Sequence, residues 1–119
     1  MTLHHVQLAC PPGSEDTLRG YYVGVLGCVE LPKPPVLAAR GGAWFRSPGG
    51  ADLHLGVEED FRPARKAHPA LNWADLDGLA ATIAAAGYEV TWGDDEVPGM
   101  RRFHTFDVLG NRLEFVSTT

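Results

Sequence analysis

The chain has 119 residues, which suits a single domain and is too short for two separately folded ones. Hydrophobic residues make up 45% of it and charged residues 21%, so the composition is that of a globular protein with a core rather than of a disordered tail. The formal net charge of −5 argues against broad nucleic-acid binding, which needs a basic surface.

The first predicted elements are a strand and a helix. Apolar and polar residues alternate over residues 3–10 in the period-two pattern of a half-buried strand, which Pro11 then breaks. Ser14 offers an N-cap hydroxyl before an acidic first turn, and an apolar stripe at helical spacing runs as far as Leu26. The pattern therefore predicts an amphipathic helix that starts after Ser14 and is closed by Gly27.

Proline and glycine separate the next segments. The prolines at positions 32, 34 and 35 predict a connector or an edge strand over residues 31–40. Residues 43–47 and 52–57 have strand patterns and flank Pro48-Gly49-Gly50, which predicts a hairpin. Residues 58–66 mix both signs of charge without a clear period, and we interpret them as a linker.

The second half of the chain repeats this order. Residues 68–73 alternate as a strand, and Asp75 then caps a second amphipathic helix that ends at Gly87. Residues 88–92 are a further strand candidate, and an acidic loop follows over 93–99. Residues 101–108 and 111–117 form a terminal hairpin around Leu109-Gly110. A strand, a helix and three short strands are thus predicted twice.

The spacing of equivalent residues supports an internal repeat. With His5 matched to His68, the helix-ending glycines follow 22 and 19 residues later, while His54 and Glu114 follow 49 and 46 residues later. Both spacings are longer in the first half of the chain by the same number of residues. The extra residues of the first half therefore lie before its helix ends, and the later elements of the two halves keep the same register. We predict an α+β fold in which two βαβββ modules form a cup-shaped mixed sheet with helices on its outer face.

The expected single domain, 1–119, divides into module one at about 1–57, a linker at 58–67 and module two at about 68–119. One face of its strands is apolar and suits covering by helices, whereas the opposite face carries four metal-binding side chains, His5, His54, His68 and Glu114. Three imidazoles and one carboxylate suit a divalent ion such as Zn, Ni, Co, Fe or Mn. In a metal-free alternative, the same groups bind one another or an organic ligand.

Other polar residues are candidates for substrate binding. Strand parity places Gln7, Trp44 and Asn72 on the pocket face, although Trp44 is equally consistent with a place in the core. Arg102, one of two adjacent arginines, is either a solvated cation or an anion clamp at the rim. His104 has no equivalent in the first module, and we expect it to have a structural or substrate-edge role.

The sequence also predicts a location. No apolar run approaches the roughly 20 residues of a membrane helix, and no basic-then-apolar leader opens the chain. Cys10 and Cys28 form no CxxC motif, so neither a disulfide framework nor a cysteine zinc site is indicated. We therefore expect a cytoplasmic protein with two free thiols and with no membrane partner.

Four motifs extend over nearly the whole chain. They are Leu3-His4-His5-Val6-Gln7-Leu8-Ala9, Tyr21-Tyr22 with Leu26-Gly27, Ala74-Asp75-Leu76-Asp77 with Ala86-Gly87, and Asp107 with Gly110-Asn111-Arg112-Leu113-Glu114-Phe115. In this order and spacing the chain resembles the vicinal oxygen chelate superfamily, which groups glyoxalase I, bleomycin- and fosfomycin-resistance proteins, methylmalonyl-CoA epimerase and type I extradiol dioxygenases.

The resemblance assigns the metal-ligand positions to the same four residues and implies a homodimeric, metal-dependent enzyme. The ion would polarise the oxygens of a small, oxygen-rich and anionic substrate, with Glu114 as the catalytic proton carrier, in lyase, isomerase or ring-cleaving chemistry. His54 stands where glyoxalase I has a glutamate, which counts against glyoxalase I itself. The alternative that the superfamily offers is a metal-free protein that sequesters a small molecule, as in bleomycin resistance.

Overall fold

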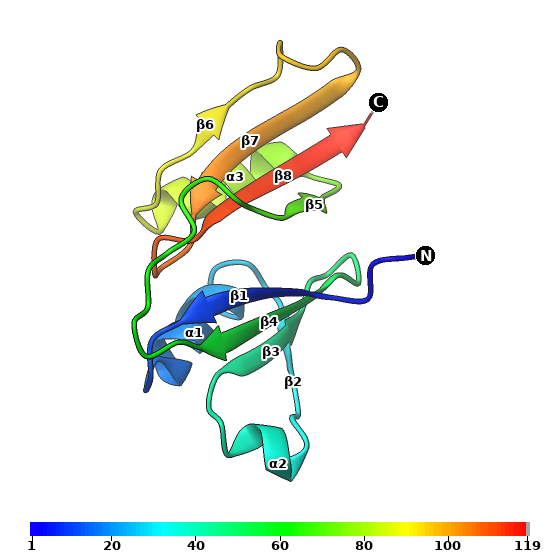
Figure 1. The fold of residues 1–119 in the computed structure, drawn as a ribbon. Coiled ribbons are helices and arrows are strands. Elements are labelled where there is room, and N and C mark those ends of the chain that lie inside the picture. Colours follow the sequence, from blue (N-terminus) through cyan, green and yellow to red (C-terminus); the bar gives the residue numbers. More distant parts are fainter. Residues whose placement is uncertain (119) are drawn as a thin grey trace. The chain divides into compact units, whose positions relative to one another are not determined.

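The computed structural model describes residues 1–118, and Thr119, the last residue of the expected second module, lies outside the described residues. The chain consists of two compact units, Met1–Ala64 and Arg65–Thr119, whose elements are drawn in Figure 1. No helix in residues 1–118 combines the length and the apolar character needed to cross a membrane.

The first unit is a four-stranded mixed sheet with two helices. Its elements are β1 (Val6–Cys10), α1 (Glu15–Tyr22), β2 (Val29–Leu31), α2 (Pro35–Ala38), β3 (Ala43–Arg46) and β4 (Asp52–Val57). The strand order is β1-β4-β3-β2, with β1 parallel to β4 and the other neighbours antiparallel. Helix α1 packs against β3 (Figure 1).

The second unit repeats this arrangement. Its elements are β5 (Ala70–Asn72), α3 (Leu76–Ala85), β6 (Thr91–Trp92), β7 (Met100–Phe106) and β8 (Arg112–Thr118). The strand order is β5-β8-β7-β6, again with one parallel pair at one edge, and α3 packs against β8. The predicted α+β class and the two βαβββ modules are therefore confirmed, with the eight strands in two four-stranded sheets.

The helix stripes predicted from the sequence form the cores. Leu18 and Tyr22 of α1 are fully buried, and the Tyr22 ring stacks on Phe45 of β3 with the ring centroids 5.2 Å apart. In the second unit, Ile83 of α3 and Phe103 of β7 are fully buried as well. Each such side chain contributes about 1.5–3 kcal/mol through removal of apolar surface from water, so the outer face of each sheet is held by its own helix.

Helix α1 begins directly after Ser14, as predicted, but its cap and its C-terminal end differ from the prediction. The hydroxyl of Ser14 donates to the carbonyl oxygen of Pro11 at 2.7 Å, so its side chain does not cap the helix. The helix ends at Tyr22 rather than near Leu26, because the N–H groups of Gly24 and Leu26 bond five residues back and widen the last turns. At the second helix the prediction is confirmed, since Asp75 accepts a hydrogen bond from the Gly78 N–H at 3.0 Å.

The predicted connector at 31–40 contains regular structure after all. Strand β2 ends at Leu31, just before the first proline, and α2 begins at Pro35. A proline is tolerated in the first turn of a helix because its missing N–H has no intrahelical partner there, and its fixed φ suits the helix. The prolines therefore position a short helix instead of excluding one.

A buried turn sets the register of the β7–β8 hairpin. One carboxylate oxygen of Asp107 accepts hydrogen bonds from the N–H groups of Leu109 and Asn111, both at 2.9 Å, and the other accepts from Asn111 Nδ2 at 3.3 Å. With the turn fixed in this way, His104 on β7 lies directly opposite Glu114 on β8.

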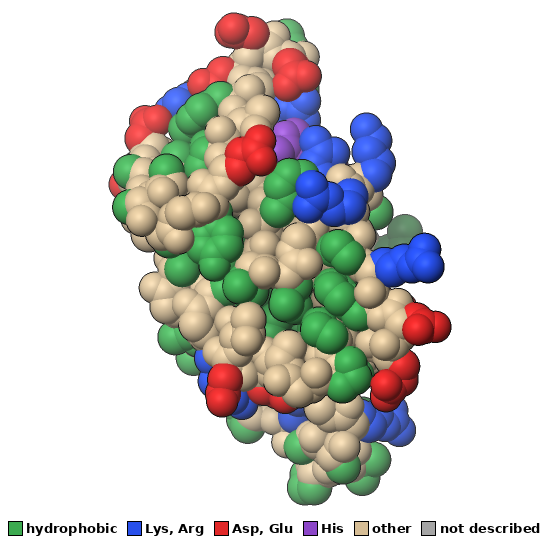
Figure 2. All heavy atoms as spheres, turned by 90° about the vertical axis from the view of Figure 1, so that its left-hand side faces the viewer, with side chains coloured by type: hydrophobic (Ala, Val, Ile, Leu, Met, Phe, Trp, Pro, Cys, Tyr) green, Lys and Arg blue, Asp and Glu red, His purple; other side chains and the backbone are tan. Residues whose placement is uncertain are grey.

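Charged side chains pair within each unit. Arg46 bonds Asp52 across the β3–β4 pair at 2.7 Å, and Arg101 bonds Asp77 and Asp94 at 3.0 and 3.2 Å. Figure 2 shows both acidic and basic side chains on the face that it presents. The surface of this face is therefore mixed in charge rather than uniformly basic.

Candidate functional site

Three potential metal ligands converge in the second unit. His68 precedes β5, His104 lies on β7 and Glu114 lies on β8. The hairpin register puts His104 opposite Glu114, and the Glu114 N–H donates to the carbonyl oxygen of Pro69 at 3.0 Å, which draws the segment with His68 alongside β8. One ligand atom from each of the three side chains lies within 4.8 Å of the others.

The two histidines point their Nε2 atoms at the same carboxylate oxygen. Glu114 Oε1 lies 2.8 Å from His68 Nε2 and 3.2 Å from His104 Nε2. His68 Nδ1 lies 2.8 Å from the carbonyl oxygen of Lys66, which only accepts hydrogen bonds, so Nδ1 carries a proton. The contact between His68 Nε2 and Glu114 Oε1 then needs a cation between two lone pairs: either a proton on Nε2, which makes the ring a hydrogen-bond donor to the carboxylate, or a metal ion.

Arg102 holds the second oxygen of Glu114. Its Nη1 lies 3.3 Å from Glu114 Oε2, and its Nη2 lies 3.4 Å from Glu96 Oε1. The Arg102 N–H also donates to Asp94 at 3.1 Å, which ties the acidic loop before β7 to that strand. The guanidinium Nε is buried and makes no hydrogen bond to any residue that the structure describes. Arg102 therefore fixes Oε2 and leaves Oε1 facing the imidazoles.

The electrostatics favour the protonation states that bind metals. Burial acts to raise the pKa of Glu114, but the hydrogen bonds from His68 and Arg102 outweigh it, so the pKa lies below the ordinary glutamate value. Burial lowers the pKa of His104, and the nearby positive charge of Arg112 lowers it further. An ionised carboxylate and a neutral imidazole are the forms that coordinate a divalent ion.

This donor set fits a divalent metal ion. Two imidazole nitrogens and one carboxylate suit Zn and also Fe, Mn, Co or Ni, with positions left for substrate or water. The bond from His68 Nδ1 to a backbone carbonyl is the outer contact that metal-bound histidines usually make, because it fixes the tautomer and the ring orientation.

The first unit brings together its own candidate residues. The rings of His5, just before β1, and His54, on β4, stack with centroids 3.9 Å apart, and Trp44 stacks on His54 at 4.2 Å. Burial lowers the pKa of His54, and the neighbouring His5 lowers it further. These rings and Gln7 line a pocket of about 580 Å³. Trp44 is half-buried, in keeping with both the pocket and the core interpretations.

The candidate residues thus fall into groups. His68 and Glu114 meet in the second unit, where Arg102 joins them through an ion pair. Asn72 lies apart from this cluster: it is exposed at the end of β5, paired with Val116.

His104 was left outside the site by the sequence interpretation. Its corresponding residue in the first unit is Trp44, which faces His54 across β3 and β4 just as His104 faces Glu114 across β7 and β8. The sequence did carry a signal, because a turn closed between Asp107 and Asn111 places residues 104 and 114 opposite each other. Counting back from that turn, rather than matching residue types between the modules, would have found His104.

Comparison with solved structures identifies relatives across the whole chain. A Bacillus anthracis protein described as belonging to the glyoxalase family is 37% identical, with a TM-score of 0.92, over 100% of this chain and 96% of its own. A glyoxylase/bleomycin resistance protein/dioxygenase domain from Frankia sp. EAN1pec is 21% identical, with a TM-score of 0.77, and the match covers 100% of this chain and 93% of that domain.

A third relative is the fosfomycin resistance protein FosX from Listeria monocytogenes, in a mutant form complexed with Mn(II) and 1S,2S-dihydroxypropylphosphonic acid. It is 15% identical, with a TM-score of 0.77, and the match covers 99% of this chain and 92% of FosX. No protein-family model matches the chain, and the search of curated proteins found no match.

The identity to the Bacillus anthracis protein extends over both units, and the sequence motifs agree with it. The chain therefore belongs to the glyoxalase family of the vicinal oxygen chelate superfamily, which includes the bleomycin resistance proteins and dioxygenases.

Proposed function

We propose that this protein is a metal-dependent enzyme that acts on a small, oxygen-rich and anionic substrate, in lyase, isomerase or ring-cleaving chemistry. The observation that carries the proposal is the convergence of His68 Nε2 and His104 Nε2 on one oxygen of a buried, ionised Glu114. Two imidazole nitrogens and a carboxylate that face one another need a cation between them, and a divalent ion can fill this role. In our proposal these three residues hold a divalent ion.

The ion would supply Lewis-acid chemistry, polarising substrate oxygens and stabilising the negative charge that develops on them. The carbonyl of Lys66 keeps the proton of His68 on Nδ1, so Nε2 stays available. Arg102 fixes the far oxygen of Glu114 and thereby orients the near one. Glu114 is our candidate proton carrier, because it is the buried carboxylate of the set and one of its oxygens is held by Arg102.

The substrate class is proposed from charge and from a relative. Two neutral histidines and one carboxylate leave about one net positive charge on a divalent ion, which favours an anionic substrate. The FosX structure holds Mn(II) with a dihydroxypropylphosphonic acid, a small and oxygen-rich anion, within the same fold. We carry over from it only the type of ligand, a divalent ion with an oxygen-rich anion.

Further ligands are proposed from the first unit. His5 and His54 are the remaining members of the four-residue set predicted from the sequence, and we keep them as candidate ligands. We also propose a homodimer, because β1 and β5 are edge strands of their sheets and edge strands gain from pairing or covering. Size-exclusion chromatography with light scattering tests the dimer, and a monomer at micromolar concentration would contradict it.

Metal analysis of the full chain tests the ligand set. Protein purified without chelator and then offered Zn, Mn, Fe, Co and Ni is expected to retain about one ion per chain. His68→Ala, His104→Ala and Glu114→Gln are each expected to lose it, whereas His4→Ala, a matched histidine control outside the set, keeps it. His5→Ala measures whether the first unit contributes.

The outcome also separates the two classes of function. Wild-type metal content in both His104→Ala and Glu114→Gln would refute the proposed site. A wild-type chain that binds none of the five ions would favour the alternative, a metal-free protein that sequesters a small molecule.

A further inference from the structure

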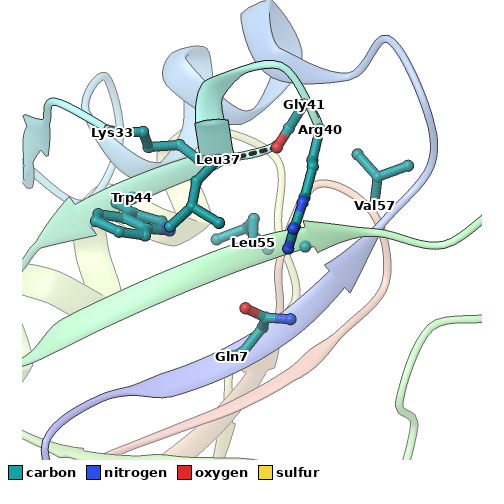
Figure 3. Close-up of a pocket in the computed structure, with 9 residues that line it drawn as sticks. Gln7, Lys33, Leu37, Arg40, Gly41, Trp44, Leu55 and Val57 are labelled. Carbon is teal, nitrogen blue, oxygen red and sulfur yellow. Dashed lines mark hydrogen bonds between the residues drawn. The ribbon is translucent and has the colours of Figure 1, made fainter. Parts of the chain in front are cut away.

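A second pocket in the first unit has an unusual charge. It encloses about 230 Å³ between α2 and the sheet, and its lining residues are Gln7, Lys33, Leu37, Arg40, Gly41, Trp44, Leu55, Gly56 and Val57 (Figure 3). Two of these side chains are cationic and none is a carboxylate, although the chain carries a net charge of −5. The excess of positive charge is therefore local to this pocket.

Arg40 makes no ion pair within residues 1–118. Arg19, Arg46, Arg101 and Arg102 each bond a carboxylate of their own unit, whereas the side chain of Arg40 bonds none. Figure 3 shows Arg40 extending from the loop after α2 to β4, with Gln7 on the neighbouring strand β1. A guanidinium without a carboxylate partner keeps its fork of donors for an outside anion.

The backbone around the pocket is shaped to hold these groups. Gly42 has a φ of +81°, and a Cβ there would overlap the carbonyl oxygen of Leu55, so only glycine lets the loop with Arg40 approach β4. A Cβ at Gly56 would collide with the side-chain amide of Gln7, so glycine leaves room for that amide. The ammonium group of Lys33 donates to the carbonyl of Gly41 and ties the same loop down.

The remaining walls are apolar. Leu37, Trp44, Leu55 and Val57 surround the polar end formed by Arg40 and Gln7. We propose that this pocket binds the carboxylate of a small apolar molecule, with the carboxylate oxygens on the Arg40 guanidinium and the Gln7 amide and the apolar body against Trp44 and its neighbours. A guanidinium fork matches a carboxylate, and a pocket of this volume suits a ligand of about ten non-hydrogen atoms.

The pocket does not depend on a metal ion. It shares Gln7, Leu37 and Trp44 with the larger pocket that His5 and His54 line, so a carboxylate bound here would lie beside the candidate residues of the first unit. Binding is nevertheless expected in metal-free protein, so the test below and the metal analysis can fail independently.

The experiment is an NMR titration of the metal-free full chain with benzoate, with its neutral counterpart benzamide and with inorganic phosphate. The expected result is saturable shifts of the Trp44 indole N–H and of the Gln7 side-chain amide, with benzoate binding at least about fivefold more tightly than benzamide or phosphate. Arg40→Gln is expected to weaken benzoate binding about fivefold and to leave benzamide unchanged. Arg62→Gln, a matched exposed arginine outside the pocket, should bind benzoate as the wild type does.

Three results would overturn the inference as a whole, and a fourth would overturn the apolar body of the ligand. The first is equal affinity for benzoate and benzamide, and the second is wild-type affinity in Arg40→Gln. The third is the absence of saturable shifts at Trp44 and Gln7. Phosphate binding as tight as benzoate binding would overturn the assignment of an apolar body.

Discussion

Replacing Asp107 with alanine tests the turn that brings the histidines and Glu114 together. Asp107 and Asn111 are 3% and 0% exposed, and the Asp107 carboxylate accepts hydrogen bonds at 2.9, 2.9 and 3.3 Å. A hydrogen bond to a charged group contributes about 1.5–3 kcal/mol, and less where water can replace it, as at half-buried Leu109. Asp107→Ala is therefore expected to lower the free energy of unfolding by about 3 kcal/mol.

Urea denaturation followed by circular dichroism measures this change. Asp107→Asn keeps one acceptor oxygen but sets an NH₂ group against Asn111 Nδ2, so it is expected to cost about 1–2 kcal/mol, less than alanine. Asp60→Ala, an exposed acidic residue in the linker, is the control and should change stability by less than about 0.5 kcal/mol.

The same variant should loosen the site. Amide hydrogen exchange at His104 and Glu114 is expected to accelerate in Asp107→Ala, because their strand pairing depends on the turn. If Asp107→Ala were as stable as Asp60→Ala and exchanged at the wild-type rate, the turn could not be what sets the β7–β8 register.

Three further predictions concern other parts of the chain. The pKa of Asp77 lies below its ordinary 3.8 because Arg101 hydrogen-bonds the carboxylate, so the stabilisation by Asp77 is present above pH 3.8 and is lost as pH falls through the lowered pKa. In a series of urea denaturations, Asp77→Asn should therefore be less stable than the wild type at pH 7 and equally stable at the acid end. A difference in stability that stays constant with pH would contradict this. Burial raises the pKa of the Cys28 thiol to about 11, so iodoacetamide at pH 8 should label Cys28 only after unfolding. Mass spectrometry measures the labelling. If the native protein were labelled at the rate of a free cysteine, the thiol would be accessible. Gly42→Ala should lower the free energy of unfolding by about 2 kcal/mol or more, because the new Cβ overlaps the Leu55 carbonyl oxygen and the φ is +81°. Gly50→Ala, where φ is +95° and nothing lies within 4 Å of a Cβ, should lower it by about 1 kcal/mol. Equal decreases in melting temperature for the two variants would rule out the overlap.

The sequence by itself determined the repeat and most of its elements. The cap at Asp75 and the helix-ending Gly87 act over a few residues, and strand alternation reflects the geometry of one chain segment, so each can be interpreted locally. Alternation also predicted that His5, His54, His68 and Glu114 share one face; within the first unit His5 stacks on His54, and within the second His68 bonds Glu114. The superfamily was evident from motifs that follow this order.

Only the tertiary structure decided the composition of the site. His104 enters it because the buried Asp107 turn fixes one hairpin register, and Arg102 joins it by reaching Glu114 rather than solvent. The free Arg40 beside Gln7 arises likewise, from a short helix that the prolines did not reveal. Local patterns fix which face of a strand a residue occupies, but the convergence of side-chain atoms depends on hydrogen bonds and packing between segments far apart in the chain.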